Sequence, residues 1–255
     1  MNQATTTAEK VRLFVPERVA RAGAWLALAL FILAMPTFLV TTNVRWAFND
    51  LRLYRFGFEQ HNVVSTTGLD MTQLMVVARD IRDYFGSSQE FLDTTVVLGG
   101  EERPLFNQGE ILHMRDVKVL VRGVVRLQEA AGAYIIGYLV IGLLATRGKR
   151  TRALVGRVMV GSLFTVGLLA FGGLAVAVGF DRLFDQFHFL SFSEGTFTFD
   201  PRYNYLTRLF TERFFLQGTL FIAVATIVEA TVLALGAWGI RRWALNRGET
   251  FAGSN

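Results

Sequence analysis

Four stretches of the chain are each long enough and apolar enough to cross a lipid bilayer. About 20 apolar residues span a hydrocarbon core roughly 30 Å thick. The four stretches are residues 22–40, 128–145, 155–178 and 216–238. Because 52% of the 255 residues are hydrophobic and only 18% are charged, the chain lacks the polar coat of a soluble domain. The sequence predicts an all-α polytopic membrane protein with four transmembrane helices, forming a single membrane domain over residues 1–255.

The basic residues of the chain gather beside these stretches. Twelve of the 26 Lys and Arg residues precede the first stretch, link the second to the third, or follow the fourth, whereas residues 41–127 and 179–215 are slightly acidic. The positive-inside rule therefore places both termini in the cytoplasm and makes residues 41–127 and 179–215 extracytoplasmic segments. Since topology explains the basic residues, no nucleic-acid partner is expected.

Several kinds of chemistry are excluded by what the sequence lacks. There is no cysteine, so the chain has no disulfide, no thiolate nucleophile and no Cys-ligated zinc. There is also no serine in a nucleophile elbow, no glycine loop before Lys-Ser or Lys-Thr, and no His-Glu-x-x-His. We expect neither a cofactor nor a metal.

The first extracytoplasmic segment, residues 41–127, has the patterns of a mixed fold. Apolar residues at helical spacing follow Asp70, which with Gln73 resembles a capping box. A second helical pattern begins near Asn107 and is predicted to run into the second span. Three aromatic residues upstream alternate with polar ones as in a half-buried strand: Tyr54, Phe56 and Phe58.

The second extracytoplasmic segment, residues 179–215, is short and rich in aromatic residues. Phe180, Phe184 and Phe187 have helical spacing, which predicts a short helix on the outer leaflet. Asp200 and Pro201 mark a turn, and an amphipathic helix is predicted through residues 205–210 before the fourth span. A lipid substrate could be met at this surface.

The three histidines of the chain all lie in the predicted extracytoplasmic segments. His113 would share a helix face with Glu110 and Asp116, either of which could stabilise its charged form. His188 lies in the aromatic segment, so the two imidazoles could converge at the membrane surface. The alternative is that each is an interfacial or packing residue, and this alternative is stronger for His61, which lies in a polar loop.

One ionisable residue falls near the middle of a predicted span. An acidic group inside a membrane is a candidate functional residue, so Glu229 could serve a transporter or proton-coupled channel. The alternative is a protonated carboxyl group that hydrogen-bonds Ser162 or Thr165 of the third span.

Two motifs resemble those of a known bacterial family, the lipoprotein intramolecular transacylases. The first is residues 106–118, FNQGEILHMRDVK. The second comprises the following residues: Phe187, His188, Asp200, Pro201, Tyr205, Leu206, Phe210, Glu212, Phe214 and Phe215. The resemblance covers nearly the whole chain. It implies a multi-pass protein of the bacterial cell membrane whose active site, on the extracytoplasmic face, contains His113 and His188 as catalytic residues supported by Asp116 and Glu110.

The resemblance also implies a reaction and a substrate. Characterised family members move the sn-2 acyl chain of a lipoprotein's diacylglyceryl-cysteine to the cysteine α-amine, so the expected partners are the lipid-modified N-terminus of bacterial lipoproteins and membrane lipid. One imidazole would accept the amine proton, and the other would stabilise the oxyanion or protonate the departing oxygen. The sequence leaves open which histidine has which role. An alternative is a non-enzymatic membrane protein whose external segment binds a lipid or protein partner.

Overall fold

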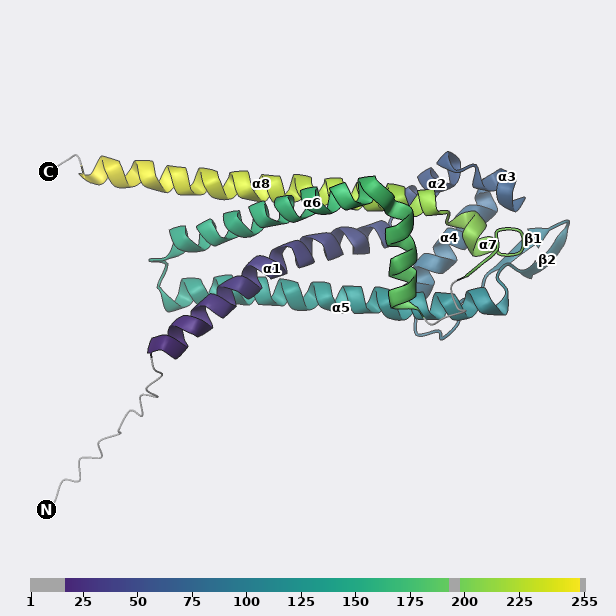
Figure 1. Cartoon of the computed structure of the whole chain (residues 1–255), viewed down its shortest axis with the longest axis horizontal. Coiled ribbons are helices and arrows are strands. Elements are labelled where there is room, and N and C mark those ends of the chain that lie inside the picture. The colour runs from purple at the N-terminus through teal and green to yellow at the C-terminus, as the bar shows by residue number, and fades with distance from the viewer. Residues whose placement is uncertain (1–16, 193–197, 253–255) are drawn as a thin grey trace, which may run out of the picture.

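Four long helices form the body of the protein in the computed structural model, which describes residues 17–192 and 198–252. They are α1 (Glu17–Asn49), α5 (Gln108–Ala145), α6 (Thr151–Ser191) and α8 (Glu212–Ala252). All four are long and apolar enough to span a membrane. They form an elongated bundle with most of the shorter elements at one end (Figure 1). The protein is therefore a multi-pass, all-α membrane protein, as predicted.

The shorter elements form a head that caps one end of the bundle. The head contains α2 (Leu51–Gln60), α3 (Val63–Thr67), α4 (Met71–Gly86), β1 (Thr95–Leu98), β2 (Glu101–Pro104) and α7 (Tyr205–Leu209). The first part of α5 packs against it, since Met114 lies in the head's hydrophobic core. The helix that was predicted to begin near Asn107 thus continues without interruption into the second span.

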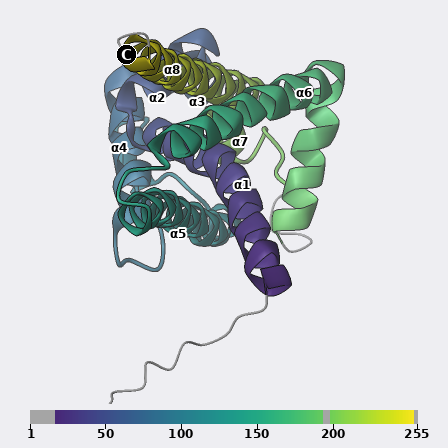
Figure 2. The same cartoon turned by 90° about the vertical axis from the view of Figure 1, so that its left-hand side faces the viewer.

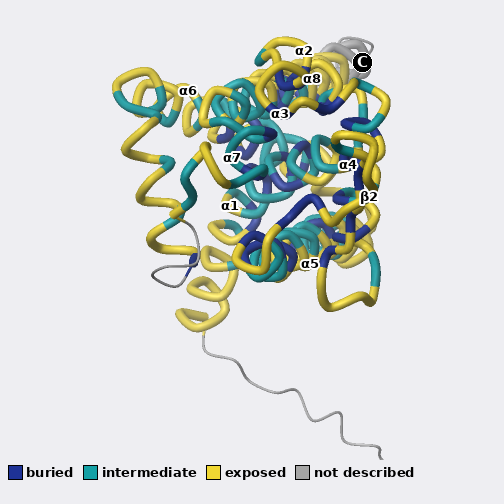
Figure 3. The backbone as a smooth tube through the Cα atoms, turned by 90° about the vertical axis from the view of Figure 1, so that its right-hand side faces the viewer, coloured by how far each residue is buried: buried dark blue, intermediate teal, exposed yellow. Residues whose placement is uncertain are grey.

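Burial is reversed between the head and the bundle. In the head, apolar side chains such as Phe58, Leu74 and Val77 are completely buried. Along the bundle, large apolar side chains point outward, and Phe171 and Val178 are 78% and 86% exposed. Figure 3, which looks along the bundle from the head end, shows buried residues gathered toward the centre of the molecule and exposed residues around them. The head therefore has the buried apolar core of a water-soluble domain, whereas the outer surface of the bundle suits lipid contact.

The predicted strand through Tyr54, Phe56 and Phe58 is wrong, because these residues lie in helix α2. Asp50 caps this helix by accepting a hydrogen bond from the Arg52 backbone N–H. Tyr54 and Phe58 are four residues apart and share the buried face, while Phe56 is 48% exposed. In so short a run, three alternating aromatic residues are compatible with the period of a strand and with that of a helix. Tertiary packing selects the helix.

The only strands in the described part of the chain form an antiparallel hairpin, β1–β2. Gly99 and Gly100 make its two-residue turn, both with positive φ (65° and 88°), which residues with a Cβ rarely adopt. The hairpin is joined to α4, because the Gln73 side chain accepts a hydrogen bond from the Val97 N–H at 2.7 Å. Asp70 caps α4 by accepting a hydrogen bond from the Gln73 N–H, which is one half of the predicted capping box, whereas the Gln73 side chain bonds Val97 in place of the Asp70 N–H.

A buried polar contact joins α1 to α8 inside the bundle. The Asn43 side-chain amide donates to Glu229 at 2.8 Å and to the Thr226 hydroxyl at 3.1 Å. The prediction that Glu229 pairs with Ser162 or Thr165 is therefore wrong. Thr165 instead donates to a carbonyl of its own helix. Glu229 acts as an interhelical hydrogen-bond acceptor, which is a common use of a polar residue between membrane helices.

Candidate functional site

A break in α6 determines where the candidate site forms. Gly179 has non-helical φ and ψ angles of −178° and 75°. Beyond it, residues 180–191 turn away from the bundle axis and run across it along one side of the bundle, from the level of α8 to the level of α5 (Figures 1 and 2). The helix that was predicted from the spacing of the aromatic residues is present, and its direction carries His188 to the amino-terminal part of α5.

The two histidines singled out in the sequence lie next to each other. The imidazole rings of His113 on α5 and His188 on α6 are 6.3 Å apart between centroids and only 15° from parallel. His113 is 8% exposed, and His188 is partly buried. The residues are 75 positions apart in the sequence, so only the tertiary fold brings them together.

Aromatic rings enclose this pair. His113 packs against Phe192 and Phe199, with ring centroids 4.7 and 5.4 Å away. His188 packs against Phe184 at 4.3 Å and also contacts Phe192 at 5.5 Å. Such surroundings exclude water and strengthen electrostatic interactions within the site. The sequence predicts these aromatic residues at the membrane interface, but their packing around the histidines depends on the direction that α6 takes after Gly179.

One hydrogen bond fixes the proton distribution on His188. Its Nδ1 lies 2.8 Å from the backbone carbonyl oxygen of Phe184, one turn earlier in α6. A carbonyl oxygen can only accept, so Nδ1 must carry a hydrogen. In neutral His188 the lone pair, which takes up a proton when the ring becomes charged, is therefore on Nε2.

Glu110 connects the site to α7. Its carboxylate accepts a hydrogen bond from the Leu206 N–H at 2.8 Å, and on its own helix it accepts one from Asn107 at 2.9 Å. Asn107 in turn caps α5 through the Glu110 N–H, completing a capping box. These hydrogen bonds favour the ionised form of Glu110, but burial has the larger effect and raises its pKa above the ordinary value of 4.5.

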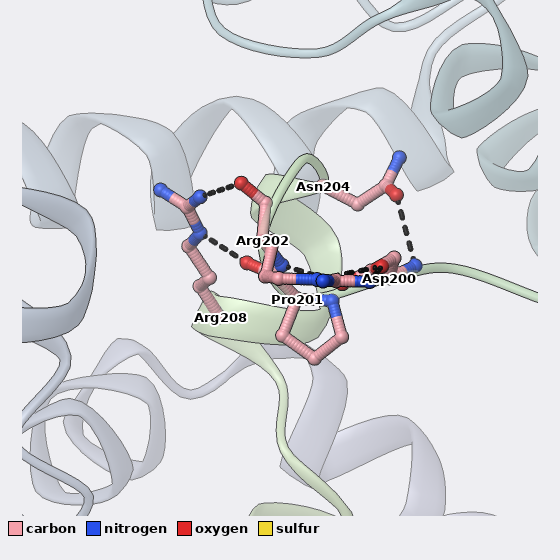
Figure 4. Close-up of polar contacts among 5 residues, drawn as sticks. All are labelled: Asp200, Pro201, Arg202, Asn204 and Arg208. Carbon is pink, nitrogen blue, oxygen red and sulfur yellow. Dashed lines mark hydrogen bonds and ion pairs between the residues drawn. The ribbon is translucent and has the colours of Figure 1, made fainter.

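The turn before α7 is stabilised by its own polar contacts (Figure 4). The Asp200 carboxylate accepts hydrogen bonds from the backbone N–H and the guanidinium group of Arg202. The Arg208 guanidinium donates to the carbonyls of Pro201 and Arg202, and the Asn204 side chain accepts from the Asp200 N–H. The predicted turn at Asp200–Pro201 is thus present, and it lies between Phe199 and α7.

The other residues noted in the sequence lie around the site or away from it. Asp116 forms an ion pair with Arg115 at 3.6 Å, so its support of His113 stays a prediction. His61 follows α2 and contacts the ring of Phe214 rather than joining the pair. Lys118, also in the first motif, is buried against the Tyr84 ring, 3.9 Å from its centroid.

Comparisons with known proteins identify the family of the chain. The family model of the lipoprotein intramolecular transacylase Lit matches residues 29–215, which is more than half of the chain. The chain belongs to this family. Its members are enzymes named for intramolecular acyl transfer on lipoproteins. No curated protein sequence matches the chain. The family match includes both motifs and both histidines of the pair.

Solved structures share the fold. The membrane-integral lipoprotein intramolecular transacylase Lit of Bacillus cereus is similar with a TM-score of 0.68 at 16% identity, over 90% of this chain and 99% of that one. A variant of the same protein with a histidine replaced by alanine gives a TM-score of 0.68 at 15% identity, over 91% and 99% of the two chains. Within the described residues of this chain, no group of three His, Cys, Asp or Glu side chains could hold a metal ion.

Proposed function

We propose that this protein transfers the sn-2 acyl chain of a lipoprotein's diacylglyceryl-cysteine to the α-amine of the same cysteine. The product is an N-acyl, mono-acylglyceryl lipoprotein, the lyso-form. The observation that carries this proposal is the pairing of His113 and His188, whose ring centroids are 6.3 Å apart, in an aromatic enclosure at the end of the bundle.

His188 is the proton carrier in this proposal. Its Nε2 accepts a proton from the α-amine as the nitrogen attacks the ester carbonyl carbon, and Nδ1 continues to donate to the Phe184 carbonyl as the ring becomes charged. When the tetrahedral intermediate collapses, the bond from the carbonyl carbon to the glyceryl oxygen breaks, and Nε2–H gives its proton to that oxygen. One C–N bond replaces one C–O bond, and the proton moves from the amine to the alcohol.

His113 has the complementary role. A ring N–H of His113 would donate a hydrogen bond to the oxyanion of the tetrahedral intermediate. The nearby faces of Phe192 and Phe199 exclude water, which makes such a bond stronger than in solution. Because amine and ester belong to one lipid-modified cysteine, their proximity supplies a further rate advantage.

The proposed topology follows from the charges and the position of the head. The basic link 146–152 between α5 and α6 and the basic end of α8 lie at the end of the bundle away from the head (Figure 1). With these parts and both termini in the cytoplasm, the head and the histidine pair face the extracytoplasmic side. Lipid-modified lipoprotein N-termini lie in the outer leaflet there, within reach of residues 180–191.

Mass spectrometry of a reporter lipoprotein's N-terminal lipopeptide tests this function. The host should be a bacterium that makes only diacylglyceryl-lipoprotein, with and without this chain. We expect N-acyl, mono-acylglyceryl-cysteine only when the chain is present. Unchanged diacylglyceryl-cysteine, with the protein shown to be in the membrane, would contradict the proposal.

Variants of the histidines separate catalysis from folding. His113→Gln and His188→Gln should each lower the rate by about 10² to 10⁴, the usual size of a general acid–base contribution. His61→Gln is the matched control, because His61 is in the same head but apart from the pair. Retained activity in both His113→Gln and His188→Gln would exclude the proposed roles.

A further inference from the structure

A cavity lies beside the membrane end of the head, outside the histidine site. Its volume is about 1110 Å³, and its walls come from the end of α1, the end of α4 and the middle of α5. Neither histidine of the pair nor any of the aromatic residues around them lines it. The mechanism proposed above makes no use of this cavity.

The cavity lies where the chain changes from polar to apolar. On α1, Arg45 is the first charged residue after Arg21, and on α5, Glu129 is the last before Arg147. Both residues line the cavity. Trp46, also in its wall, stacks on Phe221 of α8 with ring centroids 5.3 Å apart, an aromatic placement typical of the membrane interface. The cavity is therefore level with lipid headgroups.

The lining has more positive than negative charge. It contains four arginines and two acids: Arg45, Arg82, Arg122, Arg126, Asp83 and Glu129. Arg45 pairs with Glu129 at 3.7 Å, and Arg82 pairs with Asp83 at 2.8 Å. Arg122 donates to the Ser87 carbonyl, and Arg126 makes no ion pair with any described residue. Two guanidinium charges are thus left without an acidic partner in the cavity.

Topology does not explain this cluster. The basic residues that determine orientation lie in the link 146–152 and in the last turns of α8, at the opposite end of the bundle from the head (Figure 1). A cluster of arginines at the head end needs another reason. Guanidinium groups bind phosphate oxygens in a bidentate manner, and basic pockets at membrane surfaces bind anionic headgroups.

We infer that this cavity binds the phosphate of an anionic phospholipid headgroup. Its volume exceeds that of a usual small-molecule pocket, so a glycerophosphate group fits. The phosphate lies between Arg122 and Arg126, and Phe48 and Val125 in the wall contact the glycerol end of the acyl chains. The bound lipid links the head to the bilayer and holds α4 against α5.

Native mass spectrometry tests this inference without any measurement of catalysis. The full chain is released from nanodiscs that contain equal amounts of phosphatidylglycerol and phosphatidylcholine. We expect the wild type to retain phosphatidylglycerol in preference to phosphatidylcholine. Arg126→Gln should weaken this retention about tenfold, because a charge-assisted hydrogen bond is lost. Arg122→Gln combined with Arg126→Gln should abolish it.

Arg103→Gln is the matched control. Arg103 is exposed on β2 and does not line the cavity, so its replacement makes the same change of charge outside the cavity. Equal retention of the two lipids by the wild type, or unchanged preference in the Arg122 and Arg126 variants, would overturn the inference. Inorganic phosphate added to the protein in detergent distinguishes the source. If it binds at the arginines while neither lipid is preferred, the site takes a soluble phosphate and not a lipid.

Discussion

The Glu110 carboxylate on α5 accepts a hydrogen bond from the Leu206 backbone N–H at the start of α7, at 2.8 Å and across 96 positions of sequence. Glu110 is 1% exposed, and His113 follows it by one turn of the same helix. The contact attaches α7 and the turn before it to the helix that carries His113. We therefore propose that Glu110 is a positioning residue, which acts on the site by holding α7 in place.

Replacing Glu110 should release α7 from α5. In Glu110→Gln, an amide N–H₂ group replaces one of the two carboxylate oxygens. It faces a backbone N–H that donated a hydrogen bond to that oxygen, so a buried donor loses its partner. We expect a loss of about 1–3 kcal/mol in the free energy of unfolding. Amide hydrogen exchange should become faster over residues 204–209 and stay unchanged over the β1–β2 hairpin.

Glu59→Gln is the control for this variant, because Glu59 is exposed on α2 and its ion pair with Arg55 is long, at 3.9 Å. Such a surface pair contributes little to stability. Equal exchange at residues 204–209 in Glu110→Gln and wild type would show that Glu110 does not hold α7.

The raised pKa of Glu110 predicts how stability depends on pH. Burial raises this pKa above its ordinary value of 4.5, so the folded protein keeps a proton that the unfolded chain releases. The stabilisation is complete below 4.5 and is lost as pH rises through the folded-state pKa. The stability difference between wild type and Glu110→Gln should therefore shrink as pH rises.

Thermal unfolding in detergent at several pH values between about 4 and 7 measures this difference. Comparing the two proteins removes the contributions of other carboxyl groups, such as Asp83, whose pKa is lowered by Arg82. A difference that grows with pH would mean that the ionised carboxylate is the more stabilising form, contrary to the prediction.

Much of this architecture could be predicted from the sequence, because the signals are long or chemically specific. The four spans rest on runs of about 20 apolar residues. The α4 face and the Asp70 cap follow from helical spacing and from capping chemistry. The sequence alone did not decide whether His113 and His188 lie close together, and the structure brings them together.

Other features depend on contacts between distant segments. Tyr54 and Phe58 pack as a helix because their neighbours come from α4 and α8. The partner of Glu229 is Asn43, 186 positions away, and nothing in the local sequence of either residue points to the other. The arginine-lined cavity is likewise formed by α1, α4 and α5 together, so it could not be predicted from the sequence.

Glu229 should contribute to stability and not to acyl transfer. Glu229→Gln keeps an oxygen that can accept from the Asn43 amide, so the free energy of unfolding should change by less than about 0.5 kcal/mol. Glu229→Leu removes that acceptor and should cost about 0.6–2 kcal/mol, the range for hydrogen bonds between membrane helices. Unfolding in detergent measures both values.

Both Glu229 variants should still produce lyso-form lipoprotein in the mass-spectrometric assay, because Glu229 contacts α1 inside the bundle and not the histidine pair. A loss of acyl transfer in Glu229→Gln, at unchanged stability, would instead show that the carboxyl group has a functional role of the kind expected of a proton-coupled protein.

Lys118 belongs to the same motif as His113, yet its contacts indicate a structural role. Its ammonium group donates to the Ser87 hydroxyl at 3.3 Å and to the Gln89 carbonyl, and it lies over the Tyr84 ring. Burial lowers the pKa of Lys118. These contacts hold the loop after α4 against α5, on a different part of the helix from His113.

Lys118→Met keeps the apolar stem and removes the charge, so the Gln89 carbonyl loses its donor. Relief of the cost of burying an ammonium group offsets part of that loss, and we expect a net destabilisation of about 1–2 kcal/mol. For a protein of this size that corresponds to a fall in Tm of roughly 2–8 °C. At temperatures where the variant stays folded, kcat/KM for acyl transfer should remain within about threefold of wild type, whereas a catalytic lysine would lose at least about 10². A loss of that size without unfolding would place Lys118 in the chemistry and not in the scaffold.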